Sequence, residues 1–301
     1  MKRGSSFLKT ALLCLVCTFF WGAGYPVLKL SYGFWGIGGR DVAGKLLFAG
    51  IRFTASGGLL MLVSAVRHKG LLCLSKGILG WAAVLGLFQT ALQYSFTYMG
   101  TAATTGSKSS VLNQLSVFLV VLLSPVFFRT EKLTLKKLAG CLLGFAGILV
   151  MNLEGLSFSM ELGDPLILLA SCFAATGYLI SKAMPKSCDP LTSTAWQQLL
   201  GGFVLLAAGV FGGGKLAAVS LPGLGCLLFL ILAAAISYSL WFYLLQQNEI
   251  GRISVSKFLT PLFGVLFSGI LLGEPIFTPE NGLALLLVCA GIVTVNSTKH
   301  A

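Results

Sequence analysis

Long runs of apolar residues, separated by short polar segments, occupy most of the chain and predict ten membrane-spanning helices. Each run holds about 20 residues, the number that a helix needs to cross the hydrocarbon layer of a bilayer. The predicted spans are residues 9–30, 44–66, 78–99, 104–128, 135–153, 163–184, 191–211, 222–246, 253–273 and 279–297.

The second half of the chain repeats the first half about 144 residues later. The string ALQYS at 91–95 recurs as AISYS at 235–239, and GGLL at 57–60 recurs as GGFV at 201–204. Each copy holds five predicted spans. Because five is odd, the second copy enters the membrane from the side opposite to the first, an arrangement typical of secondary transporters. The sequence therefore predicts an all-α membrane protein of ten transmembrane helices, arranged as two inverted five-helix repeats, residues 9–153 and 161–298.

The composition agrees with a membrane protein. The chain is 56% hydrophobic and only 10% charged, whereas soluble domains are about a quarter charged. With the N-terminus placed inside, fourteen Lys and Arg residues fall on the inner side, against Arg40, Lys45 and Lys215 outside. The net charge of +12 thus indicates topology and not nucleic-acid binding. We expect a multi-pass protein of the plasma membrane, specifically a bacterial-type inner membrane. Both termini are expected in the cytoplasm, and the lipid bilayer is the expected partner.

Several short motifs line up with the ends of the predicted spans. They are FWG at 20–22, RF at 52–53, LTPLF at 259–263, LGE at 272–274, and GI at 147–148 and 291–292. Their order, spacing and duplication resemble the EamA domain of the drug/metabolite transporter superfamily, present twice. The resemblance implies a ten-helix carrier of small metabolites, often amino acids or related compounds and frequently moved outward. It implies no particular substrate.

Charged residues inside the spans are costly and usually face a cavity or a partner. Lys29 lies at a span end and can reach the interface. Arg52 either ties helices together through backbone carbonyls or contacts the substrate. Lys108 and Lys257 either line a cavity or play a structural part. At the repeat offset, Lys257 is equivalent to Asn113, which predicts polar groups at equivalent places of both halves.

Neutral polar side chains within spans should also face inward, because lipid cannot satisfy them. They bond either to one another or to a ligand in a central cavity. Together with neighbouring aromatic residues they give the candidate substrate-binding residues: Trp21, Tyr25, Arg52, Gln89, Gln93, Tyr94, Lys108, Asn113, Gln114, Tyr238, Trp241 and Lys257.

Several functional classes find no support in the sequence. Asp and Glu occur only at span edges, and no HExxH or GxSxG motif is present, so we expect no enzyme, no cofactor and no metal site. The glycine-rich segment 209–216 ends in Leu where a phosphate loop needs Ser or Thr, so we expect no ATPase motor in this chain. Cys14 and Cys17 are expected to be buried, reduced thiols. The pairs Gly140/Gly144 and Gly269/Gly273 indicate close helix packing or, alternatively, a homodimer face.

Three functions follow from these observations. The first is a secondary transporter that moves a small polar or amphipathic metabolite, an amino acid or analogue, by alternating access, with export as one direction. The second is a carrier of organic anions or phosphate esters, motivated by cations in the spans without a deep acid. The third is a non-transporting membrane scaffold or a channel, although no filter-like segment is present.

Overall fold

The computed structural model describes residues 2–68, 76–155, 159–185, 189–217 and 219–297, and every regular element within them is helical. Residue 298, the expected end of the second repeat, lies outside this part. The elements are α1 (Lys2–Phe34), α2 (Val42–His68), α3 (Lys76–Gly86), η1 (Leu87–Leu92), α4 (Gln93–Thr101), α5 (Gly106–Phe127), α6 (Leu135–Met151), η2 (Leu153–Gly155), α7 (Gly163–Ala183), α8 (Pro190–Phe211), α9 (Leu221–Gln247), α10 (Ile250–Ser254), η3 (Val255–Phe258), α11 (Leu259–Leu272) and α12 (Pro279–Asn296).

These elements form ten membrane crossings, which confirms the predicted all-α membrane fold. Eight helical stretches of the described residues are each long and apolar enough to span a membrane. The other two crossings are α6, which has 17 residues, and the continuous segment α3–η1–α4, which a π-helical stretch divides. At 1.5 Å per residue, α6 is about 26 Å long, close to the hydrocarbon thickness.

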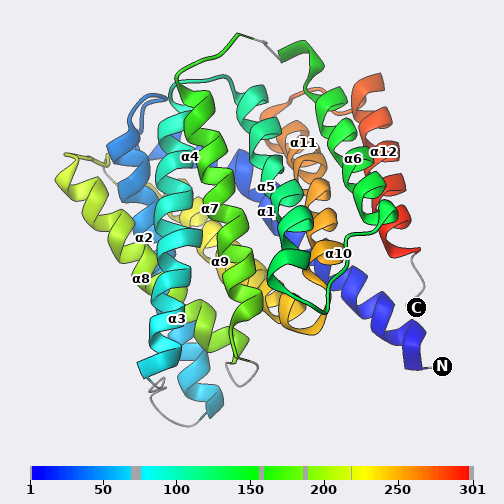
Figure 1. Ribbon diagram of the computed structural model, residues 1–301. Helices are drawn as coiled ribbons and strands as arrows, with labels where there is room; N and C mark the ends of the chain where they lie inside the picture. Colours follow the sequence, from blue (N-terminus) through cyan, green and yellow to red (C-terminus); the bar gives the residue numbers. More distant parts are fainter. Residues whose placement is uncertain (1, 69–75, 156–158, 186–188, 218, 298–301) are drawn as a thin grey trace.

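The chain begins and ends on the same side of the molecule, as ten crossings require (Figure 1). We call this side the terminal side. The connections that follow α1, α4, α6, α8 and α11 lie on the other side, which we call the distal side. Since each repeat crosses the membrane five times, the two repeats run in opposite directions.

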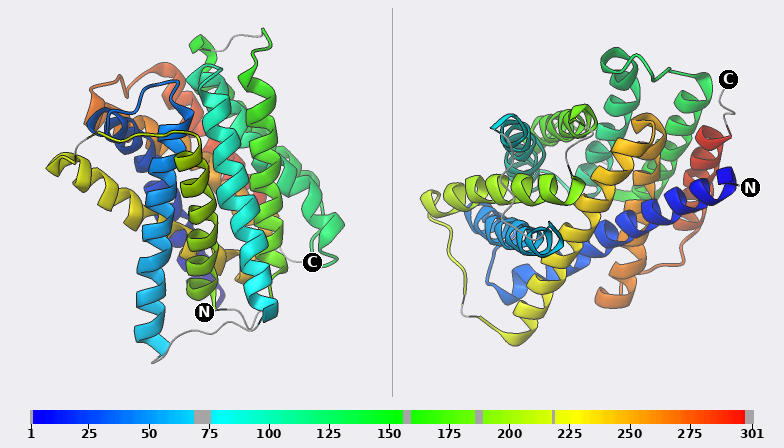
Figure 2. Two further views of the ribbon diagram at one scale, coloured as in Figure 1. Left: turned by 90° about the vertical axis from the view of Figure 1, so that its left-hand side faces the viewer. Right: turned by 90° about the horizontal axis from the view of Figure 1, so that it is seen from below.

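Helix contacts follow the symmetry of the repeats. The second crossings of the two repeats, α2 and α8, pack against each other (Figures 1 and 2). The two fifth crossings, α6 and α12, do the same. The first crossing of each repeat packs against the third and fourth of the other: α1 contacts α9 and α11, and α7 contacts α4 and α5. Exchanging the repeats leaves this pattern unchanged.

Glycine allows close approaches between these helices, for example near α6 and α12. A Cβ atom on Gly140 would lie 2.5 Å from the carbonyl oxygen of Gly291, and one on Gly144 would lie 2.3 Å from the Phe258 ring. Both glycines are therefore covered by other parts of the same chain, as in the close packing of membrane helices by small residues.

Candidate functional site: a central cavity open on the distal side

A cavity of about 1200 Å³ lies between the two repeats. Its mouth is formed by residues at the distal ends of the helices, among them Lys29, Glu154 and Glu274. The side chains of Lys29 and Glu274 are 67% and 47% exposed and form an ion pair of 2.8 Å. At its deep end the cavity reaches Tyr178 and Lys257, more than halfway toward the terminal side. The cavity is thus accessible from the distal side.

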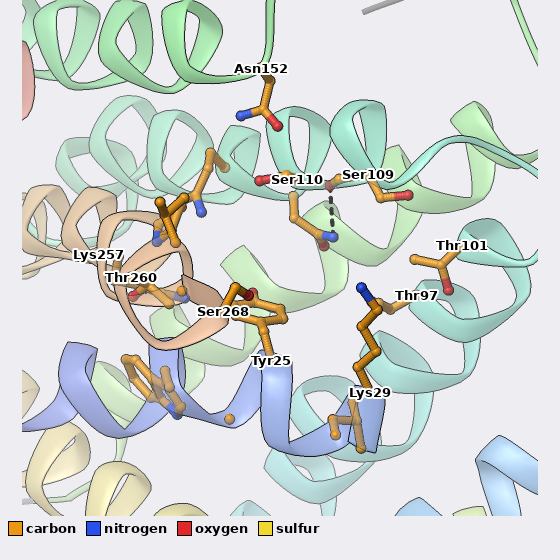
Figure 3. A pocket seen from close by; sticks show the side chains of 18 of the residues that line it. Tyr25, Lys29, Thr97, Thr101, Ser109, Ser110, Asn152, Lys257, Thr260 and Ser268 are labelled. Carbon is orange, nitrogen blue, oxygen red and sulfur yellow. Dashed lines mark hydrogen bonds between the residues drawn. The ribbon is translucent and has the colours of Figure 1, made fainter. Parts of the chain in front are cut away.

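Polar side chains line the walls near the mouth (Figure 3). Tyr25 and Lys29 extend into the cavity from α1, and Ser110 of α5 and Asn152 lie on the opposite wall. Tyr25 is 55% exposed, although it belongs to the middle of a membrane helix. The exposed side chain of Tyr25 is therefore accessible from the cavity.

Aromatic rings form the deep part of the cavity. The hydroxyl groups of Tyr94 and Tyr238 lie 2.9 Å apart and share a hydrogen bond. These two residues are equivalent in the repeats, so their contact marks the pseudo-twofold axis. Trp21 packs edge-on against Tyr238, with ring centres 5.6 Å apart, and against Trp241, at 5.1 Å. We call this deep aromatic part of the cavity, with Trp21 and Tyr238, the floor. It can hold the apolar part of a ligand.

Two cations face this aromatic lining. The Lys257 ammonium donates a hydrogen bond to the Tyr178 hydroxyl and lies 5.2 Å from the centre of the Trp21 ring. The guanidinium of Arg52 lies 4.3 Å from the centre of the Phe53 ring. Within the described part of the chain, neither cation forms an ion pair with a carboxylate. The cavity therefore carries positive charge that the surrounding protein leaves uncompensated.

The terminal side of the cavity is closed by a packed core. A cluster that includes Cys14, Cys17, Leu244 and Ile250 fills the space between α1, α7, α9 and α10, and Cys14 and Cys17 are buried free thiols. Polar contacts hold the same region together. The buried Glu131 carboxylate accepts hydrogen bonds from the backbone N–H groups of Ile250 and Gly251, at the start of α10.

Nine of the twelve candidate residues line the cavity: Trp21, Tyr25, Arg52, Gln93, Tyr94, Asn113, Gln114, Tyr238 and Lys257. Three do not. Gln89 is buried beneath the wall, where it accepts a hydrogen bond from Ser181, and Trp241 is buried in the core cluster. Lys108 is buried at the distal end of α5 and pairs with Asp164 at 2.8 Å.

Other residues of the cavity were not among the candidates. Tyr178, which bonds to Lys257, is the equivalent of Tyr25 in the second repeat, so the internal repeat could have identified it. Tyr98 follows Tyr94 by one helical turn, and this spacing places both on one face. Tyr32 is a third tyrosine of the lining.

A ten-crossing inverted repeat around a cavity that ends inside the membrane is the architecture of a membrane transporter. The sequence matches the EamA-like transporter family twice, over residues 8–153 and 161–297. The chain therefore belongs to the EamA-like transporter family.

Individual relatives agree with this assignment. An uncharacterized transporter of Bacillus subtilis, YvbV, is 28% identical over 302 residues, covering 97% of this chain and 93% of that protein. A probable amino-acid metabolite efflux pump of Salmonella typhimurium is 28% identical over 312 residues, covering 98% and 96%. The chloroplastic WAT1-related protein At3g02690 of Arabidopsis thaliana is 28% identical over 290 residues, covering 91% and 67%. A crystal structure with a TM-score of 0.78 and 15% identity covers 96% of this chain and 98% of that one, and shows the same fold.

Proposed function

We propose that this protein is a secondary transporter that works by alternating access, and not an enzyme, a scaffold or a channel. The observation that supports this most is the central cavity, which is open on the distal side and ends on a packed core at the terminal side. A channel would need a continuous path, whereas a carrier exposes its site to one side at a time. Because the helix contacts are the same when the two repeats are exchanged, we propose a second state in which each repeat adopts the conformation of the other. In that state the cavity is open on the terminal side.

The proposed substrate is a small polar or amphipathic metabolite, an amino acid or an analogue, and export is the proposed direction. The aromatic floor offers contact to an apolar side chain, and Arg52 and Lys257 attract a carboxylate. The name of the Salmonella relative, a probable amino-acid metabolite efflux pump, supports the same class. Among the described residues of the lining, acids occur only at the mouth, so the proposal includes no carboxylate relay for protons.

The second candidate substrate class is organic anions or phosphate esters. It is supported by Arg52 and Lys257, which have no carboxylate partner among the described residues. Two uncompensated cations favour a ligand with net negative charge over a zwitterion.

The proposed location is a plasma membrane, with both termini in the cytoplasm. The excess of Lys and Arg in the connections on the terminal side supports this orientation. In that orientation the distal side faces outward, and the cavity of this structure is open to the exterior.

Transport in proteoliposomes tests the proposal. We expect saturable uptake of radiolabelled amino acids, accelerated when the same compound is present at high concentration on the other side. Gly24→Trp should abolish it, because Gly24 lines the cavity and a Cβ atom there would make only an ordinary contact of 3.9 Å with the Leu230 side chain. Gly58→Trp is the matched control, since Gly58 has open space beside it and lies outside the cavity lining. Flux that shows neither saturation nor counterflow would contradict a carrier, and selective transport of anions without an amino group would favour the second substrate class.

A further inference from the structure

Arg52 is a buried cation without the partners that a structural arginine needs. It lies in α2 and is 7% exposed. In the described part of the chain it forms no ion pair, and the neutral hydroxyl group of Tyr98 is its hydrogen-bonding neighbour. Its Nε atom is buried without a partner, while the terminal nitrogens are not fully shielded and face the cavity. Leaving a charge in this state is unfavourable.

Two other buried cations of the same protein have acidic partners. Lys108 lies 2.8 Å from the Asp164 carboxylate, and Lys137 lies 3.0 Å from the Glu249 carboxylate. The fold thus supplies an acid to these cations and supplies none to Arg52. No acid of the described residues pairs with Arg52, and the cavity is the space from which an anion can reach it.

Tyrosine side chains surround the guanidinium. Tyr32, Tyr94, Tyr98 and Tyr238 are all close enough for their hydroxyl groups to interact electrostatically with Arg52. The guanidinium carbon lies 5.5 Å from the centre of the Tyr94 ring. The hydroxyl groups of Tyr32 and Tyr98 are buried neighbours of each other and form no well-aligned hydrogen bond, although both residues line the cavity. Two neutral hydroxyl groups that can donate therefore lie beside a cation without an anion.

We infer that Arg52, Tyr32 and Tyr98 form a carboxylate-binding subsite of the cavity. A guanidinium presents two parallel N–H groups that match the two oxygens of a carboxylate, and each tyrosine hydroxyl can donate to the same oxygens. One guanidinium balances the single charge of a carboxylate, whereas a phosphate ester dianion needs more. Lys257 is less available, since its ammonium is bonded to Tyr178. The ligand's apolar part then points to the floor at Trp21 and Tyr238.

The inference deepens the proposed function and rests on it for the identity of the physiological substrate, but the subsite can be tested without that identity. The probes are four compounds that share one isobutyl group: leucine, leucinamide, 4-methylpentanoate and 3-methylbutylamine. Only leucine and 4-methylpentanoate carry a carboxylate. The measurement is the thermal unfolding midpoint of the purified protein in detergent, against equal concentrations of sodium chloride.

We expect both carboxylates to raise the midpoint of the wild-type protein, and the amide and the amine to do so at least tenfold more weakly in apparent affinity. Arg52→Gln should lose the response to the carboxylates, and Arg52→Lys should retain part of it, because it keeps the charge without the planar fork. Tyr98→Phe should weaken it several-fold. Lys136→Gln is the matched control, since it removes one positive charge from an exposed position of α6 that lies outside the cavity lining.

The midpoint without ligand separates a binding role from a structural one. Because Arg52 is uncompensated in the empty cavity, Arg52→Gln should be at least as stable as the wild-type protein when no ligand is present. A large loss of stability in Arg52→Gln, an unchanged carboxylate response in that variant, or no carboxylate response in the wild-type protein would each overturn the inference. If the subsite behaves as expected while proteoliposomes transport no amino acid, the proposed substrate fails and the subsite stands.

Discussion

Glu131 offers a direct test of how the terminal side is held closed. Its side chain is 1% exposed. One carboxylate oxygen accepts a hydrogen bond from the backbone N–H of Ile250 at 2.6 Å, and the other accepts one from Gly251 at 3.2 Å. The Lys137 ammonium lies 4.0 Å from the same carboxylate. The carboxylate thus serves as a remote cap for the start of α10 and compensates a buried cation.

Glu131→Gln keeps the shape of the side chain, removes its charge and replaces one acceptor oxygen by an amide NH₂ group. One backbone N–H of α10 then faces a donor. A hydrogen bond to a charged group contributes about 1.5–3 kcal/mol, and removing one partner of a buried ion pair costs about 3–5 kcal/mol. Lys137 keeps its contact with Glu249 at 3.0 Å, so the full cost of an unpaired buried charge does not apply. We therefore expect Glu131→Gln to lower the free energy of unfolding by about 2–3 kcal/mol, near the value for a lost hydrogen bond to a charged group.

Glu274→Gln is the control, because Glu274 occupies the equivalent place in the second repeat. Its carboxylate pairs with Lys29 at 2.8 Å, but both side chains are largely exposed, so its loss should cost less than about 1 kcal/mol. The assay is reversible unfolding in mixed micelles by added denaturing detergent, followed by tryptophan fluorescence. Equal effects of the two substitutions, or a change below 1 kcal/mol for Glu131→Gln, would refute the reasoning.

Three further predictions follow from the helix contacts and the cavity. Gly57→Val should destabilise the protein by about 1–3 kcal/mol, measured in the same assay, because its Cβ would lie 2.5 Å from a backbone nitrogen of α8. Tyr94→Phe and Tyr238→Phe should each cost about 0.5–1.5 kcal/mol, and the double variant should cost little more than one of them, because both remove the same hydrogen bond. Ser268→Cys, in a variant without other cysteines, should react with a charged thiol reagent added from the distal side, because Ser268 lines the cavity.

Each of these has its own control. Gly58→Val should be neutral, since no atom lies within 4 Å of the added Cβ; equal losses at both glycines would contradict the packing argument. Additive losses at the two tyrosines would show that the hydroxyl groups act separately. Ser237→Cys should stay unreactive, because Ser237 is fully buried in the core. If it reacts as fast as the cavity cysteine, the closed terminal side is wrong.

The fold could be predicted from the sequence because the bilayer fixes the length of a span, and the duplication fixes the count per repeat. Only two crossings obscure this pattern. The 17 residues of α6 are fewer than a full-length span, and α3–η1–α4 contains a π-helical stretch that hydrophobicity does not reveal.

The site could be predicted in part, since polar side chains in lipid must face inward. The π-helical stretch Leu87–Leu92 explains one departure. Helical spacing places Gln89 and Gln93 on one face, but the wider turn between them changes their relative direction. Gln89 then packs against Gly177 of α7, while Gln93 lines the cavity. For Lys108 the reason is different: its partner Asp164 is 56 residues away, in the other repeat, and helix periodicity carries no information about such pairs.

The hydrogen bond between Tyr94 and Tyr238 has a consequence for the energetics of transport. The two residues are equivalent in the repeats, so in the proposed alternating-access mechanism, in which the repeats exchange conformations, this contact is converted into itself. It stabilises the open-outward and open-inward states equally and favours neither. The bond from Lys257 to Tyr178 is different, because the equivalent residues of the first repeat are Asn113 and Tyr25, which are both neutral. In the proposed mechanism, the relative stability of the two open states is therefore set by residues that differ between the repeats. The Tyr94–Tyr238 contact, which both states share, does not contribute to that difference.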